Sequence, residues 1–333
     1  MSRSALLMLG LAATIATGVR AQSDSPGSRQ AYPAKPVHLI VPYPAGGVVD
    51  GLMRGIAQPV SETLGQPVIV DNRPGANTII ALEACARAAP DGYTICSSSS
   101  DGMSFNPWLY SKLPYDPERD FAPITQLVWV NGVIVAGAKV PYGTVADMVA
   151  YARANPGKVN FASFGIGSTP HFFLEWFRKQ GNVDIVHVPY KGSAQIIPAL
   201  LSGEADATFI AMGIVLPMIA SGRMKALAVT GAERSPYLPE VSTLAEQKMD
   251  PKIQNWFGVF APARTPVVIV ERLNAELVRA LGNPKFREFL RAQAFDAVGS
   301  NPREFARFLR ADRTNARAVI ARTGIRLEDA GTR

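Results

Sequence analysis

The sequence has 333 residues, of which 47% are hydrophobic and 18% charged, and its formal net charge is +7. This composition is typical of an ordinary globular protein, and the chain is longer than one hydrophobic core usually supports, so we expect two domains. Lysines and arginines are scattered among acidic residues without a basic run or an interleaved aromatic stripe, which argues against a nucleic-acid partner.

The first 21 residues are arranged like a secretory signal peptide. Arg3 precedes an apolar run over residues 5–17, and Val19 and Ala21 occupy the small-residue positions before a cleavage site. The apolar run is short for a bilayer span, although a permanent N-terminal anchor is the alternative. We therefore predict a signal peptide over residues 1–21, removed near Ala21, and a flexible polar segment over residues 22–31.

Hydrophobic strands then alternate with amphipathic helices. We predict strands over residues 37–43, 67–71 and 93–97, with helices over residues 52–64 and 78–88 between them. This βαβαβ order predicts a mostly parallel sheet flanked by helices. Gly51, Gly55 and Pro59 are spaced four residues apart on the first helix, where they predict a kink or close packing.

The alternation restarts in the second half of the chain. Thr144 and Asp147 resemble a capping box that starts a helix. Strands are predicted over residues 159–162, 184–188, 207–210, 226–229 and 256–260, before a helical tail over residues 266–324. The sequence thus predicts an α/β fold with two lobes, in which residues 32–128 and 232–333 form lobe 1 and residues 129–231 form lobe 2.

Five loops at predicted strand ends carry side chains suited to ligand binding. These loops cover residues 42–50, 72–77, 97–101, 163–171 and 188–194 and contain many small and hydroxylated residues. In open α/β sheets ligands bind beyond the carboxyl ends of the strands, where backbone amides and helix N-termini favour anions. Because loops of both lobes offer this chemistry, they predict a cleft that closes on a carboxylate.

Four residues of the chain have alternative interpretations. Asp50 could cap the helix that follows its loop, and Arg73 could hold its own loop in place, the role that we favour for it. Cys85 and Cys96 fall on a predicted helix and the next strand, so the two could form a disulfide or remain buried thiols.

The sequence predicts no catalytic group, metal site or cofactor. The three histidines have no metal-ligand spacing with one another or with the cysteines, and no nucleophile elbow, Walker loop or dinucleotide fingerprint occurs. His38 and His187 lie inside predicted strands and are expected to be packed core residues. His171 opens a helix beside a glycine-containing loop and is the histidine closest to a predicted binding loop.

Several motifs in a fixed order resemble one protein family. They include Val41-Pro42-Tyr43-Pro44-Ala45-Gly46-Gly47, Asn72-Arg73-Pro74-Gly75-Ala76, Leu113-Pro114-Tyr115-Asp116-Pro117 and His187-Val188-Pro189-Tyr190-Lys191-Gly192-Ser193-Ala194. The chain resembles the substrate-binding proteins of tripartite tricarboxylate transporters, the Bug family of periplasmic receptors. The resemblance covers essentially the whole chain after the predicted signal peptide.

This resemblance implies a type II periplasmic binding-protein fold with a ligand cleft between two lobes. It implies a periplasmic receptor that binds a small organic acid and delivers it to inner-membrane permease subunits. We expect a monomer, and no enzymatic activity, because no nucleophile–base pair is visible in the sequence. The implied ligand-binding residues are Tyr43, Ala45, Gly46, Gly47, Asp50, Ser99, Ser100, Ser163, Gly167, Ser168, Thr169, Tyr190, Lys191, Gly192 and Ser193. A receptor that signals to a membrane sensor kinase is the alternative role.

The sequence departs from the family pattern at three apolar positions. Val48 and Val49 precede the loop aspartate, where the family has a hydroxylated residue, and Ile210 stands where the family often has an acid. A missing acid argues against recognition of an amino-acid ammonium group. We therefore expect an unaminated, partly apolar or aromatic acid as the ligand.

Overall fold

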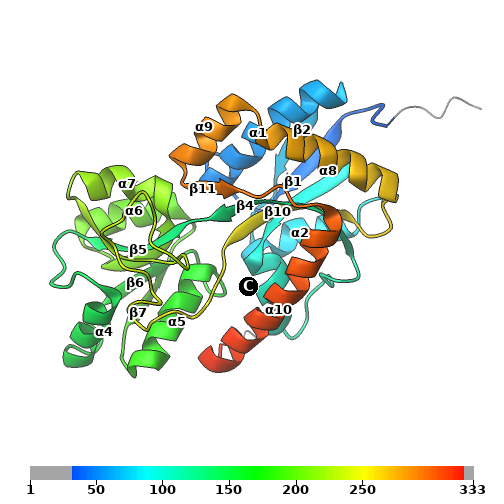
Figure 1. The fold of residues 1–333 in the computed structure, drawn as a ribbon. Helices are drawn as coiled ribbons and strands as arrows, with labels where there is room; N and C mark the ends of the chain where they lie inside the picture. Colours follow the sequence, from blue (N-terminus) through cyan, green and yellow to red (C-terminus); the bar gives the residue numbers. More distant parts are fainter. Residues whose placement is uncertain (1–31, 326–333) are drawn as a thin grey trace, which may run out of the picture. The chain divides into compact units, whose positions relative to one another are not determined.

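The computed structural model describes residues 32–325, so the predicted signal peptide and the segment 22–31 lie outside the described residues (Figure 1). Two β-sheets with packed helices make up the described fold. Six strands form the first sheet, in the order β11-β4-β10-β3-β1-β2, and five form the second, in the order β7-β6-β8-β5-β9. No helix in residues 32–325 is long and apolar enough to cross a membrane.

The first sheet is built from strands at both ends of the chain. Its strands are β1 (Val37–Val41), β2 (Val68–Asn72), β3 (Thr94–Ser99), β4 (Phe121–Val130), β10 (Trp256–Pro262) and β11 (Phe295–Ala297). β1 pairs in parallel with β2 and β3, whereas β10 pairs antiparallel with β3 and β4, and β11 antiparallel with β4. The three strands of the predicted βαβαβ run are parallel, as expected, but the antiparallel pairs of β4, β10 and β11 make the whole sheet mixed and not mostly parallel.

The second sheet comes from the middle of the chain. Its strands are β5 (Gly132–Gly137), β6 (Asn160–Ser163), β7 (Val186–Pro189), β8 (Ala207–Ala211) and β9 (Met224–Val229). β5 pairs antiparallel with β8 and β9, and β6 pairs in parallel with β7 and β8. A single residue, Asn131, separates β4 of the first sheet from β5 of the second.

Helices follow most of the strands. Those in the first half are α1 (Val48–Leu64), η1 (Ala76–Thr78), α2 (Ile79–Ala86), η2 (Asp101–Phe105), α3 (Asn106–Leu109), α4 (Val145–Ala154) and α5 (Thr169–Gly181). Those in the second half are α6 (Ser193–Ser202), α7 (Met212–Ala220), α8 (Val267–Leu281), α9 (Pro284–Ala292) and α10 (Pro302–Thr323). The Thr144 hydroxyl accepts the Asp147 amide at the start of α4, as its capping pattern predicts.

Glycines bring α1 close to α9. A Cβ added at Gly55 would lie 2.9 Å from Cδ2 of Phe286, and one at Gly51 would lie 3.3 Å from Cε2 of Phe289. The close packing predicted for this face of α1 is confirmed. The predicted helical tail is corrected, since β11 interrupts it and pairs at the edge of the first sheet.

One hydrophobic cluster joins elements of both sheets. The rings of Phe105 in η2 and Phe172 in α5 stack with centroids 4.4 Å apart. Ala316, Val319 and Ile320 of α10 belong to the same cluster. Hydrophobic contact therefore links the first-sheet elements to α5 of the second.

Cys85 of α2 and Cys96 of β3 form a disulfide, with their Cα atoms 6.1 Å apart. Both side chains are fully buried. This contact decides between the two alternatives left by the sequence, because α2 packs on β3 and brings the two thiols together.

Candidate functional site

The loop between β1 and α1 is held by the carboxylate of Asp50. This carboxylate accepts the Gly46 amide at 2.9 Å, the Arg54 Nε at 2.9 Å and the Asn72 Nδ2 at 2.9 Å. Burial raises the pKa of Asp50, but the hydrogen bonds from Arg54, Gly46 and Asn72 outweigh that effect and hold it below its ordinary value. Asp50 thus fixes the loop and is not the N-cap, a position that Gly47 occupies.

The same loop leaves its glycine end exposed. Ala45, Gly46 and Gly47 are exposed, and Gly46 has a φ of +78°, a conformation that disfavours side chains. Gly47 brings no side chain to the N-terminus of α1. The first amides of a helix lack intrahelical partners and carry partial positive charge, so this end can accept an anion.

Tyr43 connects this loop to the end of β3. Its hydroxyl lies 2.9 Å from Oγ of Ser99, and its ring meets Phe257 edge to face at 5.9 Å. Burial, and then the charge of Asp101, raise the pKa of Tyr43 far above its ordinary value, so the hydroxyl keeps its proton. The neighbouring Ser100 is buried.

Asp101 is a buried acid that sequence reasoning did not single out. Its Oδ1 accepts the Thr169 hydroxyl at 2.6 Å, which joins the end of β3 to the start of α5. Burial raises the pKa of Asp101 to about 6, although hydrogen bonds from Thr169 partly offset the effect. The available signal was its place directly after the serine run at a strand end.

Asn77 makes a second contact between loops of the two sheets. Its Nδ2 donates to the Gly167 carbonyl at 3.0 Å and to Oδ1 of Asn106 at 2.7 Å. Ala76, Asn77 and Thr78 all have positive φ, between 44° and 74°, so this turn is strained. Strained backbone is concentrated at binding sites, which makes Asn77 a further candidate within the predicted loop 72–77, although the sequence did not single out its side chain.

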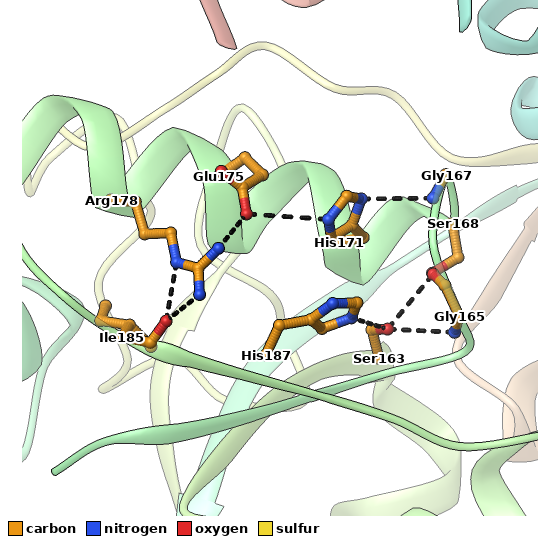
Figure 2. Close-up of polar contacts among 9 residues, drawn as sticks. All are labelled: Ser163, Gly165, Gly167, Ser168, His171, Glu175, Arg178, Ile185 and His187. Carbon is orange, nitrogen blue, oxygen red and sulfur yellow. Dashed lines mark hydrogen bonds and ion pairs between the residues drawn. The ribbon is translucent and has the colours of Figure 1, made fainter. Parts of the chain in front are cut away.

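The loop from β6 to α5 is folded by its own hydroxyls (Figure 2). Oγ of Ser163 accepts the Gly165 amide at 3.0 Å, and Oγ of Ser168 donates to the Gly165 carbonyl at 2.6 Å. Ser163, Ser168 and Thr169 are buried, and the hydrogen bonds of their hydroxyls hold the loop in its conformation. The side chains that it exposes are apolar: Phe164 is 38% and Ile166 54% accessible.

Two histidines contact this loop, His171 from α5 and His187 from β7 of the second sheet (Figure 2). Nδ1 of His171 accepts the Gly167 amide at 3.2 Å, and Nε2 of His187 lies 2.5 Å from Oγ of Ser163. Their rings are 4.5 Å apart. Burial lowers the pKa of both histidines to about 4, so both are neutral at neutral pH.

Each histidine expectation has a definite outcome. His171 is buried beside the Gly167 loop, whereas His187 is half-buried, so its expected place as a packed core residue is wrong. His38 is exposed on β1, so its expected place in the core is wrong. A histidine with a pKa of about 4 is a weak general base near neutral pH, and the Ser163–His187 contact is therefore suited to holding the loop.

The segment 190–193 lies at a separate hollow. Tyr190 donates its hydroxyl to Glu204 at 2.7 Å, and the Lys191 amide donates to Oε1 of Gln195 at 2.8 Å. Tyr190 and Lys191 line this hollow with Pro198, while Gly192 and Ser193 start α6. No contact among the described residues joins these side chains to the Tyr43, Ser99 and Asp101 group.

The departures at apolar positions also have definite locations. Ile210 is fully buried in the hydrophobic core of the second sheet, so it does not make a ligand site less polar. Val48 and Val49 are half-buried in the first turn of α1. Arg73 is exposed and pairs with Asp71 at 2.7 Å, consistent with a structural role within its own loop. No cluster of three or more metal-ligating side chains occurs in residues 32–325.

Comparisons with known proteins identify the family of this chain. The family model of the tripartite tricarboxylate transporter family receptor matches residues 52–325. Protein BugT of Bordetella pertussis is 34% identical over 306 residues, covering 91% of this chain and 94% of the relative.

Two solved structures of similar proteins contain small carboxylates. The R. palustris protein Rpa4515 with adipate superposes with a TM-score of 0.81 at 33% identity, covering 88% of this chain and 98% of that protein. MatC from Rhodopseudomonas palustris with bound malate has a TM-score of 0.80 at 28% identity, covering 87% and 100%. The chain belongs to the tripartite tricarboxylate transporter receptor family, which includes the Bug proteins.

Proposed function

We propose that this protein is a periplasmic receptor that captures a small organic acid and delivers it to the inner-membrane permease of a tripartite tricarboxylate-type system. Adipate and malate in the two similar structures support a carboxylate ligand. The proposal includes export through a signal peptide cut near Ala21, a monomeric state and closure of two lobes on the ligand. Lobe 1 is proposed to comprise residues 32–128 and 232–333, and lobe 2 residues 129–231.

The observation that carries the proposal is the convergence of strand-end loops from both sheets. Asp101 meets Thr169, and Asn77 meets the Gly167 carbonyl, so loops of the two sheets touch directly. Beside them, the N-terminus of α1 provides exposed glycines and amides for an anion.

The structure changes which residues we assign to the ligand. The amides near Ala45 and Gly47 and the hydroxyls of Tyr43 and Ser99 remain the proposed anion contacts, whereas the Gly46 amide donates to Asp50 and positions the loop. Asp50, Ser163 and Ser168 act as positioning residues, since their polar atoms bind the loops. Thr169 is also a positioning residue, since its hydroxyl donates to Asp101. Ser100 and Gly167 remain proposed ligand contacts. Tyr190, Lys191, Gly192 and Ser193 are proposed to reach the ligand on closure of the lobes, because they lie at a separate hollow in this structure.

A matched pair of substitutions at Gly47 tests the anion contact. Aspartate and asparagine cap helices about equally well and have the same shape, so Gly47→Asp and Gly47→Asn differ mainly in charge. A Cβ at Gly47 meets only the Pro44 carbonyl, at an ordinary 3.4 Å. We expect Gly47→Asp to bind a carboxylate about tenfold more weakly than Gly47→Asn, as a like charge at close range predicts.

Isothermal titration of both variants with adipate, malate, glutamate and benzoate measures this difference. Circular dichroism melting provides the folding control. Equal affinities of the two variants for every acid that binds would contradict an anion site at the N-terminus of α1.

A further inference from the structure

A second hollow lies away from the proposed ligand contacts, between the segment 107–119, which begins within α3, and helix α10. It has a volume of about 680 Å³. Trp108 and Tyr110 line it together with Arg310, Arg313 and Arg317 of α10. None of the residues assigned above to ligand binding lines it.

The three arginines form one row on α10. Residues three and seven positions apart lie on the same face of a helix, and Arg310 and Arg317 are separated by about 10 Å along the axis at 1.5 Å per residue. Arg313 between them is buried and pairs with Glu118 at 2.7 Å. The row is therefore a neutralised centre flanked by two exposed guanidinium groups.

The acids of the hollow are already engaged. Glu118 pairs with Arg313, and Asp116 accepts the amides of Glu118 at 2.8 Å and Arg119 at 3.1 Å. Within the described residues, Arg310 and Arg317 have no ion-pair partner. Two positive charges thus remain available to a ligand.

Aromatic rings also line the hollow. Trp108 is 39% exposed, and the Arg317 guanidinium lies 5.0 Å from the centroid of its ring. This contact holds Arg317 in place at the edge of the hollow. Pro107, Pro114 and Pro117 complete the lining of the loop. Aromatic-lined grooves of this kind bind extended, proline-containing peptide segments.

We propose that this hollow is a docking site for an extended acidic segment of a partner protein, with two carboxylates three residues apart. A polyproline II segment has three residues per turn and rises about 3.1 Å per residue, so side chains at i and i+3 lie on one side about 9 Å apart. That spacing matches the separation of Arg310 and Arg317. A compact dicarboxylate such as malate is too short to reach both arginines.

Fluorescence anisotropy with dye-labelled peptides tests the spacing. The probe is Pro-Glu-Pro-Pro-Glu-Pro, and the control is Pro-Pro-Glu-Glu-Pro-Pro, which has the same composition and charge. We expect the probe to bind about tenfold more tightly, because the control can engage one arginine at a time and loses one charge-assisted hydrogen-bond pair. Equal binding of the two peptides, or no binding, would overturn the proposal.

Substitutions on α10 test the arginines. The double variant Arg310→Gln with Arg317→Gln should weaken the probe at least about tenfold. Arg307→Gln is the matched control, since Arg307 is exposed on the same helix but does not line the hollow. An equal loss of probe affinity in the double variant and in Arg307→Gln would indicate non-specific charge attraction and overturn the proposal.

The chain's own C-terminal residues, which include Glu328 and Asp329, are an alternative occupant. A protein that ends at Ile325 distinguishes this case. Unchanged probe affinity supports a partner segment, whereas a gain of about tenfold or more would assign the hollow to the chain's own acidic end and overturn the proposal.

Discussion

Buried carboxyl groups with opposite electrostatic surroundings flank the proposed anion site. Asp50 is surrounded by donors and is stabilised as an anion. Asp101 has only the donors of Thr169 among its described hydrogen bonds, and burial raises its pKa. A perturbed acid at the meeting point of two loops is typical of a functional site.

Asp101 should make stability depend on pH. Its pKa rises from 3.8 in the unfolded chain to about 6 in the fold, so between these values the folded protein binds a proton that the unfolded chain releases. Stability from this group therefore falls as the pH rises from about 4 to about 6. Asp101→Asn should increase the free energy of unfolding at pH 7.5 by up to about 3 kcal/mol and leave it nearly unchanged at pH 3.5.

Urea unfolding at both pH values measures this effect. The neutral histidines His171 and His187 act in the opposite sense, since their lowered pKa makes the fold lose stability as the pH falls from about 6.5 to about 4. Their effect cancels when the variant is compared with the parent protein at the same pH. The same difference at pH 3.5 and pH 7.5 would refute the assignment.

At the scale of elements, α1 depends on glycine to approach α9. Gly55→Ala places a methyl group 2.9 Å from the buried ring of Phe286. Overpacking lowers the free energy of unfolding by about 1–3 kcal/mol, and replacing glycine by alanine in a helix raises it by up to about 1 kcal/mol. We therefore expect a net loss of stability of about 1–2 kcal/mol.

Chemical denaturation of the Gly55→Ala variant, with Gly143→Ala as the control variant, tests the expected loss of stability. A Cβ at Gly143 meets no atom within 4 Å, so this control should be nearly neutral. The truncation Phe286→Leu should recover part of the loss in the double variant, because the two sites are in contact. A free energy of unfolding of Gly55→Ala equal to that of the parent protein would show that Gly55 and the Phe286 ring are not tightly packed.

The disulfide between α2 and β3 should stabilise the fold. Closing a loop of this length removes about 3 kcal/mol of chain entropy from the unfolded state. Adding a reductant should therefore lower the melting temperature of the parent protein and leave the double variant Cys85→Ala with Cys96→Ala unchanged. An intact mass equal to that of two free thiols before reduction would exclude the bond.

Regular elements were predictable where hydrophobic periodicity was strong. The runs that form β1, β3, β6, β8 and β10 were recognised within a few residues, and so was the capped start of α4. β4 was missed because Pro123, Thr125 and Gln126 interrupt its apolar pattern. The three-residue strand β11 has too few residues for any period and is defined by its pairing with β4.

The sequence indicated which loops form the candidate site, but it did not indicate which side chains contact one another there. Glycines and hydroxyls after strands indicated which segments bind an anion, yet the Asp101–Thr169 and Ser163–His187 contacts require the tertiary fold. Sequence position also did not reveal which face of β8 carries Ile210. The register of β8 with β5 places that side chain in the core.

At the scale of the whole molecule, two features constrain any closure of the sheets on a ligand. Asn131 alone separates β4 from β5, and the Phe105–Phe172 stack ties the two sheet units together. Closure must therefore preserve or slide this hydrophobic contact, since separating it would expose buried aromatic area.

The most direct test of the central claim is calorimetric titration of the purified protein with a panel of organic acids and their uncharged amides. We expect at least one mono-, di- or tricarboxylate to bind with one-to-one stoichiometry, and its amide to bind at least about tenfold more weakly, because helix-terminal amides favour the charged group. Binding of no acid in the panel, or equal binding of an acid and its amide, would contradict the account of a carboxylate receptor.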